Sequence, residues 1–149
     1  MKKIIILLLC SGILGCATIR PVSPEERQRI YTANFDTVWT KTIEMLTEEN
    51  FPIKSMDKVN GLIQTDYNKS VTQDSWMSYA RYTVNLLIVQ IDKSNTKVII
   101  NPSYEAHLPG AITSTGYGAG LSNGEWVSKN DKDRMLIEKY FKILDKKVK

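Results

Sequence analysis

Two cysteines, Cys10 and Cys16, are the only thiols in the chain and the first candidates for chemistry. In a helix, their spacing of six residues would separate the two Cα atoms by about 9 Å, whereas a disulfide needs less than about 7 Å. A structural metal site needs about four ligands, and the only histidine, His107, stands far along the sequence. The spacing therefore favours neither a bridge nor a metal site, and it leaves a processing signal as the remaining interpretation.

The residues around the cysteines have the layout of a secretory signal. Lys2 and Lys3 give a positive start, residues 4–14 form an almost unbroken apolar run, and the small residues Gly15 and Ala17 follow. As a helix, the apolar run would span roughly 16 Å, about half of a hydrocarbon core of about 30 Å. The segment is therefore too short to remain as a membrane-spanning helix.

The end of this run, "ILGC" at residues 13–16, resembles a bacterial lipobox, in which a small residue precedes an invariant cysteine. The resemblance implies cleavage between Gly15 and Cys16, diacylglycerol on the Cys16 sulfur and usually a third acyl chain on its amine. Two or more acyl chains hold a protein firmly at a bilayer. Cys10 lacks a small residue before it, so we expect it to be removed with the cleaved signal peptide. Ala17 resembles the pattern of outer-membrane lipoproteins, which lack an aspartate there, and this implies the periplasmic side of the outer membrane.

The lipobox divides the chain into three parts. We expect a signal peptide over residues 1–15, a lipidated N-terminus and polar tether over 16–28, and a single α+β domain over 29–149. The chain has 20 basic and 16 acidic residues, so that the loss of Lys2 and Lys3 lowers the formal charge from +4 to +2. Such a small charge indicates no nucleic-acid partner.

The expected domain opens with a strand at residues 30–33 and a helix. In "NFDTVWTKTIEMLTEENFP" apolar residues recur at helical spacing. Asn34 or Asp36 can cap the start of this helix, and Asn50 is expected to end it in a left-handed conformation. Trp39 lies on the apolar stripe, so we expect it in the core.

A short strand pair follows the helix. Residues 53–57 and 62–67 favour strands and flank the dipeptide Asn60-Gly61. This dipeptide favours a tight hairpin turn because both of its residues tolerate positive φ.

A longer strand pair comes next, "YARYTVNLLIVQID" and "TKVIINPSYEAHL". Alternation places Val84, Leu86 and their neighbours at every second position on one face. From Leu86 to Ile91 both faces are apolar, so we expect cover on both sides of that stretch. Pro102 lacks a ladder donor and predicts an edge, a bulge or a strand break.

The last part of the chain contains a glycine-rich segment and a helix. Residues 109–124, "PGAITSTGYGAGLSNG", have neither a Gly-Lys-Ser/Thr ending nor the dinucleotide-binding spacing. We therefore expect a long loop that gates or lines a groove, and no phosphate site. An amphipathic helix is expected from about Asp131 to Lys147, with acidic residues near its start and lysines near its end, as the helix dipole favours.

The element order is β-α-β-β-β-β-α, which predicts an α+β domain with two helices packed on one face of an antiparallel sheet of about five strands. Within residues 30–67, "FDTVWTKTIEMLTEENFPIKSMDKVNGLIQTDY" resembles the opening of the domains in BamC-type envelope lipoproteins, in which an Asp-x-x-Trp-like helix start leads through I-x-x-x-D into a G-x-I-x-T strand. The resemblance implies a helix-grip-like fold and an accessory or scaffolding role in outer-membrane assembly or maintenance. BamC itself has two such domains and a long unstructured start, whereas we expect one domain and a short tether here.

Glu105 and His107 are the strongest candidates for catalysis, because a carboxylate beside a histidine on one strand face can orient it as a base. Asp131 or Asp133 is available to join them. No nucleophile can be named, and no Gly-x-Ser-x-Gly elbow is present. An envelope enzyme is therefore the least favoured function, and we expect no catalytic residue, cofactor or metal.

A helix-grip sheet can also enclose an apolar pocket, so that a carrier of a small apolar ligand or lipid is the alternative function. The side chains expected to line its mouth are Trp76, Met77, Tyr79, Tyr117 and Trp126. The simpler interpretation is that Trp76 and Trp126 close the core. We therefore expect a non-enzymatic binding or scaffold protein of the cell envelope, attached to the membrane through lipid on Cys16 and acting on a protein partner.

Overall fold

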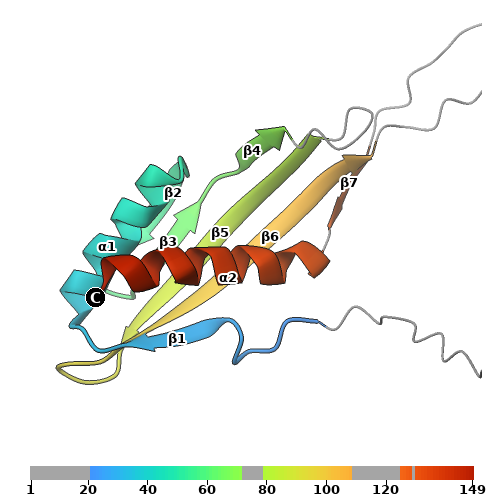
Figure 1. The fold of residues 1–149 in the computed structure, drawn as a ribbon. Coiled ribbons are helices and arrows are strands. Elements are labelled where there is room, and N and C mark those ends of the chain that lie inside the picture. The colour runs from blue at the N-terminus through green and yellow to red at the C-terminus, as the bar shows by residue number, and fades with distance from the viewer. Residues whose placement is uncertain (1–20, 72–78, 109–124, 129) are drawn as a thin grey trace, which may run out of the picture.

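Strands with alternating side chains form one antiparallel sheet, and two amphipathic helices lie on one of its faces (Figure 1). The computed structural model describes residues 21–71, 79–108, 125–128 and 130–149. It confirms the α+β, helix-grip-like class and the five-strand path, which runs in the order β1-β6-β5-β3-β2. The strands of this path are β1 (Gln28–Tyr31), β2 (Ile53–Asp57), β3 (Leu62–Thr65), β5 (Tyr79–Gln90) and β6 (Thr96–Leu108).

Two further short strands lie beside the central hairpin. β4 (Asn68–Val71) pairs with the start of β5, and β7 (Glu125–Ser128) pairs with the end of β6. The sequence predicted one strand over residues 62–67 and none at 125–128. Each added strand has only four residues, too few for a clear alternating pattern, and it forms because a long neighbouring strand offers it a free edge.

The strand β6 runs through Pro102 without a break, in register with β5 from Thr96 to Ala106. On the other side of β6, β1 pairs with residues 96–99 and β7 pairs with residues 105–108. Pro102 stands between these two partners, where β6 has no further strand partner among the described residues. Proline has no N–H group to donate to a neighbouring strand, so it is tolerated at an edge position such as this one.

The core lies between the sheet and the helices α1 (Phe35–Glu48) and α2 (Asn130–Lys147). The alternating residues expected on one face of β5 are buried there, and β6, α1 and α2 contribute equally apolar side chains. The largest fully buried side chains include Val38, Met45, Leu46, Ile63, Val84, Leu86, Ile88, Val98, Ile100, Tyr140, Phe141 and Leu144.

The opposite face of the sheet is open within the described residues. Leu62 is 42% exposed, Val89 36% and Ile91 51%, and all three lie in or next to the central strands. Among the described residues, only one side of residues 86–91 is covered, and the second cover expected from the sequence is not provided by them. Both helices contact each other and lie on the same face, so that the apolar residues of the other face remain partly in solvent.

Helix α1 begins and ends at the residues that the sequence indicated. The Asn34 side chain accepts a hydrogen bond from the Thr37 N–H at 2.8 Å, so Asn34 and not Asp36 is the cap. Asn50 has a φ of 57°, which confirms the left-handed stop. The Phe51 N–H then donates to the Leu46 carbonyl at 2.9 Å and directs the chain into β2.

The turn between β2 and β3 is wider than predicted. Only Gly61, with a φ of 68°, has a left-handed conformation in this turn, and Asn60 does not. Four residues, 58–61, separate the two strands. The Asp57 carboxylate accepts hydrogen bonds from the Asn60 N–H at 3.1 Å and the Asn60 side-chain amide at 2.7 Å, and this local bonding stabilises the longer loop.

Candidate binding groove

A surface groove follows one flank of α1, between its core-facing and solvent-facing sides, and reaches the tip of the β2–β3 hairpin. It has a volume of about 530 Å³. We call it the α1 groove, and its lining residues are Trp39, Thr40, Ile43, Glu44, Thr47, Glu48 and Lys58. All of them except Lys58 belong to α1, so the seating of this helix on the sheet determines the shape of the groove.

The floor of the α1 groove is apolar. Helical spacing places Trp39, Ile43 and Thr47 in one row along the helix. Trp39 is 6% exposed, and its ring stacks on Phe35 with the ring centroids 5.7 Å apart. Ile43 is partly buried and packs against the core. Trp39 is thus a core residue, as predicted, and it also forms part of a surface that the sequence pattern did not reveal.

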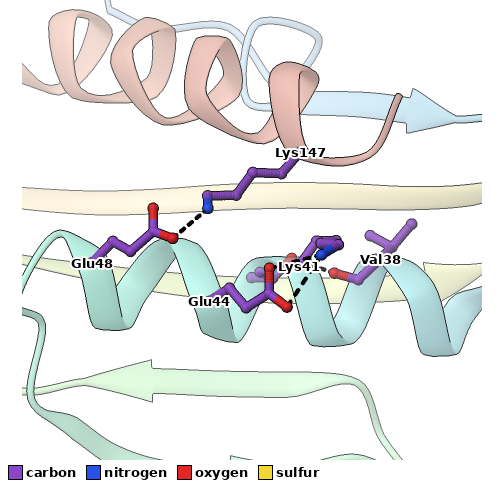
Figure 2. A network of polar contacts seen from close by, with 6 residues as sticks. Val38, Lys41, Glu44, Glu48 and Lys147 are labelled. Carbon is purple, nitrogen blue, oxygen red and sulfur yellow. Dashed lines mark hydrogen bonds and ion pairs between the residues drawn. The ribbon is translucent and has the colours of Figure 1, made fainter.

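Ion pairs within the chain neutralise the acidic side of the α1 groove (Figure 2). Lys41 Nζ lies 2.9 Å from Glu44 Oε2 in the same helix, and Lys147 of α2 places its Nζ 2.6 Å from Glu48 Oε1. Such partly exposed pairs contribute at most about 1 kcal/mol each. They nevertheless lower the negative potential in the second half of α1, where the helix dipole is also negative.

The strand β2 forms a free edge near the α1 groove. Within the described part of the chain it pairs only with β3, so one row of its main-chain groups faces solvent. Met56 pairs with Ile63, which is fully buried, and therefore points to the helix-covered side of the sheet. Met56 is still 53% exposed, and α1 packs mainly on β5 and α2.

The opposite edge of the sheet is tied to the helix layer. Arg29 of β1 forms an ion pair with Asp145 of α2, and the Tyr31 hydroxyl donates to Asp145 Oδ1 at 3.0 Å. Burial, together with the nearby Asp145 carboxylate, raises the pKa of Tyr31 far above its ordinary value. A hollow of about 400 Å³ remains at this edge, beside Arg29, Tyr31 and Asp145.

Glu105 and His107 lie two residues apart on β6, on the open face of the sheet. The Glu105 carboxylate accepts a hydrogen bond from Arg81 Nε at 2.6 Å, and Arg81 is the residue directly across the ladder. The Arg81 guanidinium also stacks over the Tyr67 ring at 4.2 Å. Glu105 is therefore part of a cross-strand ion pair, and the hairpin register, once known, would have revealed its partner.

The acidic residues that could join Glu105 and His107 lie elsewhere. Asp133 is 7% exposed on α2, on the helix-covered side of the sheet, whereas Glu105 and His107 occupy the open side. Asp131 is also on α2, and its side chain lies outside the described residues. The sheet therefore separates Asp133 from the proposed pair.

Several predicted residues lie outside the described residues. These are Cys10, Gly15, Cys16, Ala17, Trp76, Met77 and Tyr117, together with the whole segment 109–124. Tyr79 and Trp126 lie in β5 and β7, but their side chains are outside the described part.

Neither helix in the described ranges is long and apolar enough to cross a membrane. No group of three His, Cys, Asp or Glu residues in the same ranges could hold a metal ion. No family model matches the chain, and no curated protein matches it either. The fold and the groove define an α+β domain with a surface groove whose floor is apolar and whose rim is polar.

Proposed function

We propose that this chain is a lipid-anchored lipoprotein of the bacterial cell envelope whose domain binds another protein and catalyses no reaction. The observation that carries the binding function is the α1 groove, whose apolar floor is built on the rigid core through Trp39 and Ile43. Preformed clefts that combine apolar surface with polar groups that can orient a ligand are typical binding sites. The lipobox-like residues at Gly15 and Cys16 support the anchor, and the resemblance to BamC-type domains supports accessory work at the outer membrane.

The described residues favour protein binding over the two other functions. Fully buried side chains such as Leu86 and Tyr140 fill the space between sheet and helices, and the α1 groove lies outside this layer. This arrangement favours surface binding over a carrier with an internal pocket. The pairing of Glu105 with Arg81 favours a structural role for Glu105 over a catalytic one.

Acyl labelling tests the anchor. Replacement Cys16→Ser removes the thiol that would carry diacylglycerol, so metabolic labelling with a radioactive fatty acid is expected to disappear and the precursor to remain uncleaved. Cys10→Ser is the matched control and is expected to keep full labelling. Continued labelling of Cys16→Ser would refute the anchor.

Photocrosslinking in intact bacterial cells tests the binding function. A benzoylphenylalanine at Thr47, an exposed residue of the α1 groove, is expected to form an adduct with another protein. The same group at Glu138, exposed on α2, is the control and is expected to form none. Recovery of barrel-assembly components by mass spectrometry would support accessory work at the outer membrane. A co-purified lipid without a protein adduct would support the carrier instead.

A further inference from the structure

The solvent-facing side of α2 carries a row of lysines. The exposed side chains that recur at intervals of three or four residues, and so lie on one side of the helix, are Lys132, Met135, Lys139, Lys142 and Lys146. We call them the α2 lysine row. The buried side chains of the helix, such as Tyr140 and Leu144, lie on its opposite side. Two acidic residues among the described side chains border the row: Glu138, which is exposed, and Asp145, which is paired with Arg29.

Neither helix stability nor internal pairing accounts for the α2 lysine row. Lys146 lies in the last turn, where the helix dipole favours a cation, but Lys132 lies in the first turn, where the dipole disfavours one. Lys139 Nζ lies 2.5 Å from Glu49 Oε2. No ion pair in the described part of the chain engages Lys132, Lys142 or Lys146. The charge of these three amines is therefore available to a partner outside the chain.

The neighbouring helix α1 has the opposite charge balance. It lies on the same face of the sheet, and its acidic residues Asp36, Glu44 and Glu48 outnumber its single basic residue, Lys41. The positive surface of the helix layer therefore belongs to α2.

The chain leaves the domain beside α2. Val22 packs against the core, and Glu26 forms an ion pair with Arg134, so the segment before β1 lies along the first half of this helix (Figure 1). Pro21, the first described residue, stands five positions after Cys16, and five residues span at most about 18 Å. With acyl chains on Cys16, this part of the domain would lie within that distance of the bilayer surface.

The side chains of the row suit the surface of a bilayer. Lysines are attracted to anionic phospholipid headgroups at short distance. Met135 is 54% exposed within the row, and apolar side chains of a membrane-surface helix enter the boundary between headgroups and acyl chains. An acidic protein would attract the same lysines, but the short connection from Pro21 to Cys16 favours the bilayer.

From the unpaired lysines, the exposed Met135 and the short connection to Cys16, we propose that the outer side of α2 lies on the anionic phospholipid headgroups of the membrane that holds the anchor. This inference rests on the proposed lipid anchor and adds an orientation to it. The open face of the sheet points away from the bilayer, since both helices lie on the other face.

Lysine acetylation tests the proposal with the full chain, purified from bacterial membranes and added to preformed vesicles. Vesicles of phosphatidylcholine alone are compared with vesicles that also contain phosphatidylglycerol, and mass spectrometry measures the acetylation rate of each lysine. On the anionic vesicles Lys132, Lys142 and Lys146 are expected to react about fivefold more slowly, the factor that corresponds to one lysine held near an anionic surface. This slowing is expected to disappear in about 1 M sodium chloride, which screens charges beyond about 3 Å.

Lys93 is the internal control for the acetylation rates. It is exposed in the turn between β5 and β6 and is expected to react equally fast on both kinds of vesicle. Equal rates on both vesicles for the α2 lysine row, or equal slowing of Lys93, would overturn the proposal.

Two double variants test the contribution of the row. Lys132→Gln with Lys142→Gln removes two of its charges and is expected to reduce the slowing of Lys146 to less than about twofold. Lys54→Gln with Lys93→Gln removes the same charge from exposed residues of the sheet and is expected to keep the full slowing of Lys146. Urea unfolding midpoints of both variants are expected to equal that of the parent chain, because all four side chains are exposed. Equal slowing of Lys146 in the two folded variants would overturn the proposal.

Vesicle flotation separates the anchor from the orientation. A chain that floats with both kinds of vesicle but shows equal acetylation rates in the row would keep the anchor and reject this orientation. A chain that floats only with anionic vesicles would reject the anchor and support the lysine row, and one that floats with neither would reject both. In intact cells, a protein adduct with benzoylphenylalanine at Met135 would assign the row to a protein and overturn the proposal.

Discussion

Gly61 is the residue on which the β2–β3 turn depends most directly. Its φ of 68° is left-handed, its carbonyl accepts the Ile88 N–H at 2.8 Å, and a Cβ added to it would lie 1.9 Å from the Ile88 carbonyl oxygen. Gly61→Ala therefore combines backbone strain with a clash against a rigid main chain, and we expect a loss of more than about 1 kcal/mol in the free energy of unfolding. Urea unfolding followed by circular dichroism measures it.

Val59→Ala in the same loop is the control for Gly61→Ala, because Val59 is 95% exposed. We expect its effect to stay within about 0.5 kcal/mol. If the two variants unfold at the same urea concentration, the close approach of Gly61 to β5 is not a constraint on the fold.

Asp57 and Asp92 close two separate turns and give a matched pair for titration. Hydrogen bonds from the Asn60 side chain and backbone hold the pKa of Asp57 below its ordinary value, and bonds from the Asn95 side chain and the Ser94 backbone do the same for Asp92. A depressed folded-state pKa contributes stability above the unfolded-state pKa, and this contribution is lost as the pH falls through the folded-state pKa. Both turns are therefore expected to weaken only in acid.

Substitution Asn60→Ala removes the side-chain donor to Asp57 and is expected to raise the pKa of Asp57 towards its ordinary value. The pKa of Asp92 is expected to stay unchanged in the same spectra, which makes it an internal control. Carboxyl carbon chemical shifts recorded between about pH 2 and 6 by NMR measure both, in a range that spans the ordinary aspartate pKa. An unchanged titration of Asp57 would show that Asn60 does not stabilise its charged form.

At the scale of elements, the alternation of β5 makes a sharp prediction for two neighbouring leucines. Leu86 is 2% exposed in the core, whereas Leu87 lies half-buried on the open face. Leu86→Ala is expected to lower the free energy of unfolding by about 2–5 kcal/mol, since it leaves a cavity in close-packed surroundings. Leu87→Ala is expected to cost about 1 kcal/mol or less. Equal losses in urea unfolding would contradict the assignment of faces.

The same strand shows what a sequence pattern can and cannot predict about elements. Alternation predicted the buried face of β5 correctly, because the period of a strand follows from its backbone geometry. Apolar residues such as Val89 on the second face predicted a cover that the described residues do not provide. Cover depends on where both helices lie, and this is decided by the contacts of α1 with α2 and β5 and of α2 with β6, which the alternation of one strand does not report.

The candidate site was less predictable than the fold for a similar reason. The sequence placed Trp39 and Ile43 on the apolar stripe of a helix. Their spacing does not show whether residues at the border of that stripe are fully buried or line a surface groove. The exposure of Met56 depends on where the helices lie on the sheet, and the role of Glu105 depends on its register opposite Arg81. These are properties of tertiary placement, which one sequence reports only indirectly.

At the scale of the whole molecule, the segment before β1 belongs to the folded unit. Val22 packs against the core, and Glu26 Oε1 lies 3.2 Å from Arg134 Nε of α2. The Arg27 carbonyl accepts a hydrogen bond from the Ile100 N–H at 2.8 Å. The tether expected over residues 16–28 therefore has its last residues against the domain. This attachment fixes the point at which the chain leaves the domain towards the proposed anchor.

Truncation from the N-terminus tests this extension of the domain. A chain that starts at Pro21 keeps Val22, the Glu26–Arg134 pair and the Arg27 carbonyl, so we expect it to unfold at the same urea concentration as a chain that starts at Ala17. A chain that starts at Arg29 loses all three contacts. Burial of one valine contributes up to about 1.5 kcal/mol, and one main-chain hydrogen bond contributes about 1 kcal/mol. We therefore expect the free energy of unfolding of the shortest chain to be about 1–3 kcal/mol lower than that of the other two. Equal stability of all three chains would show that residues 21–28 belong to the tether and not to the fold.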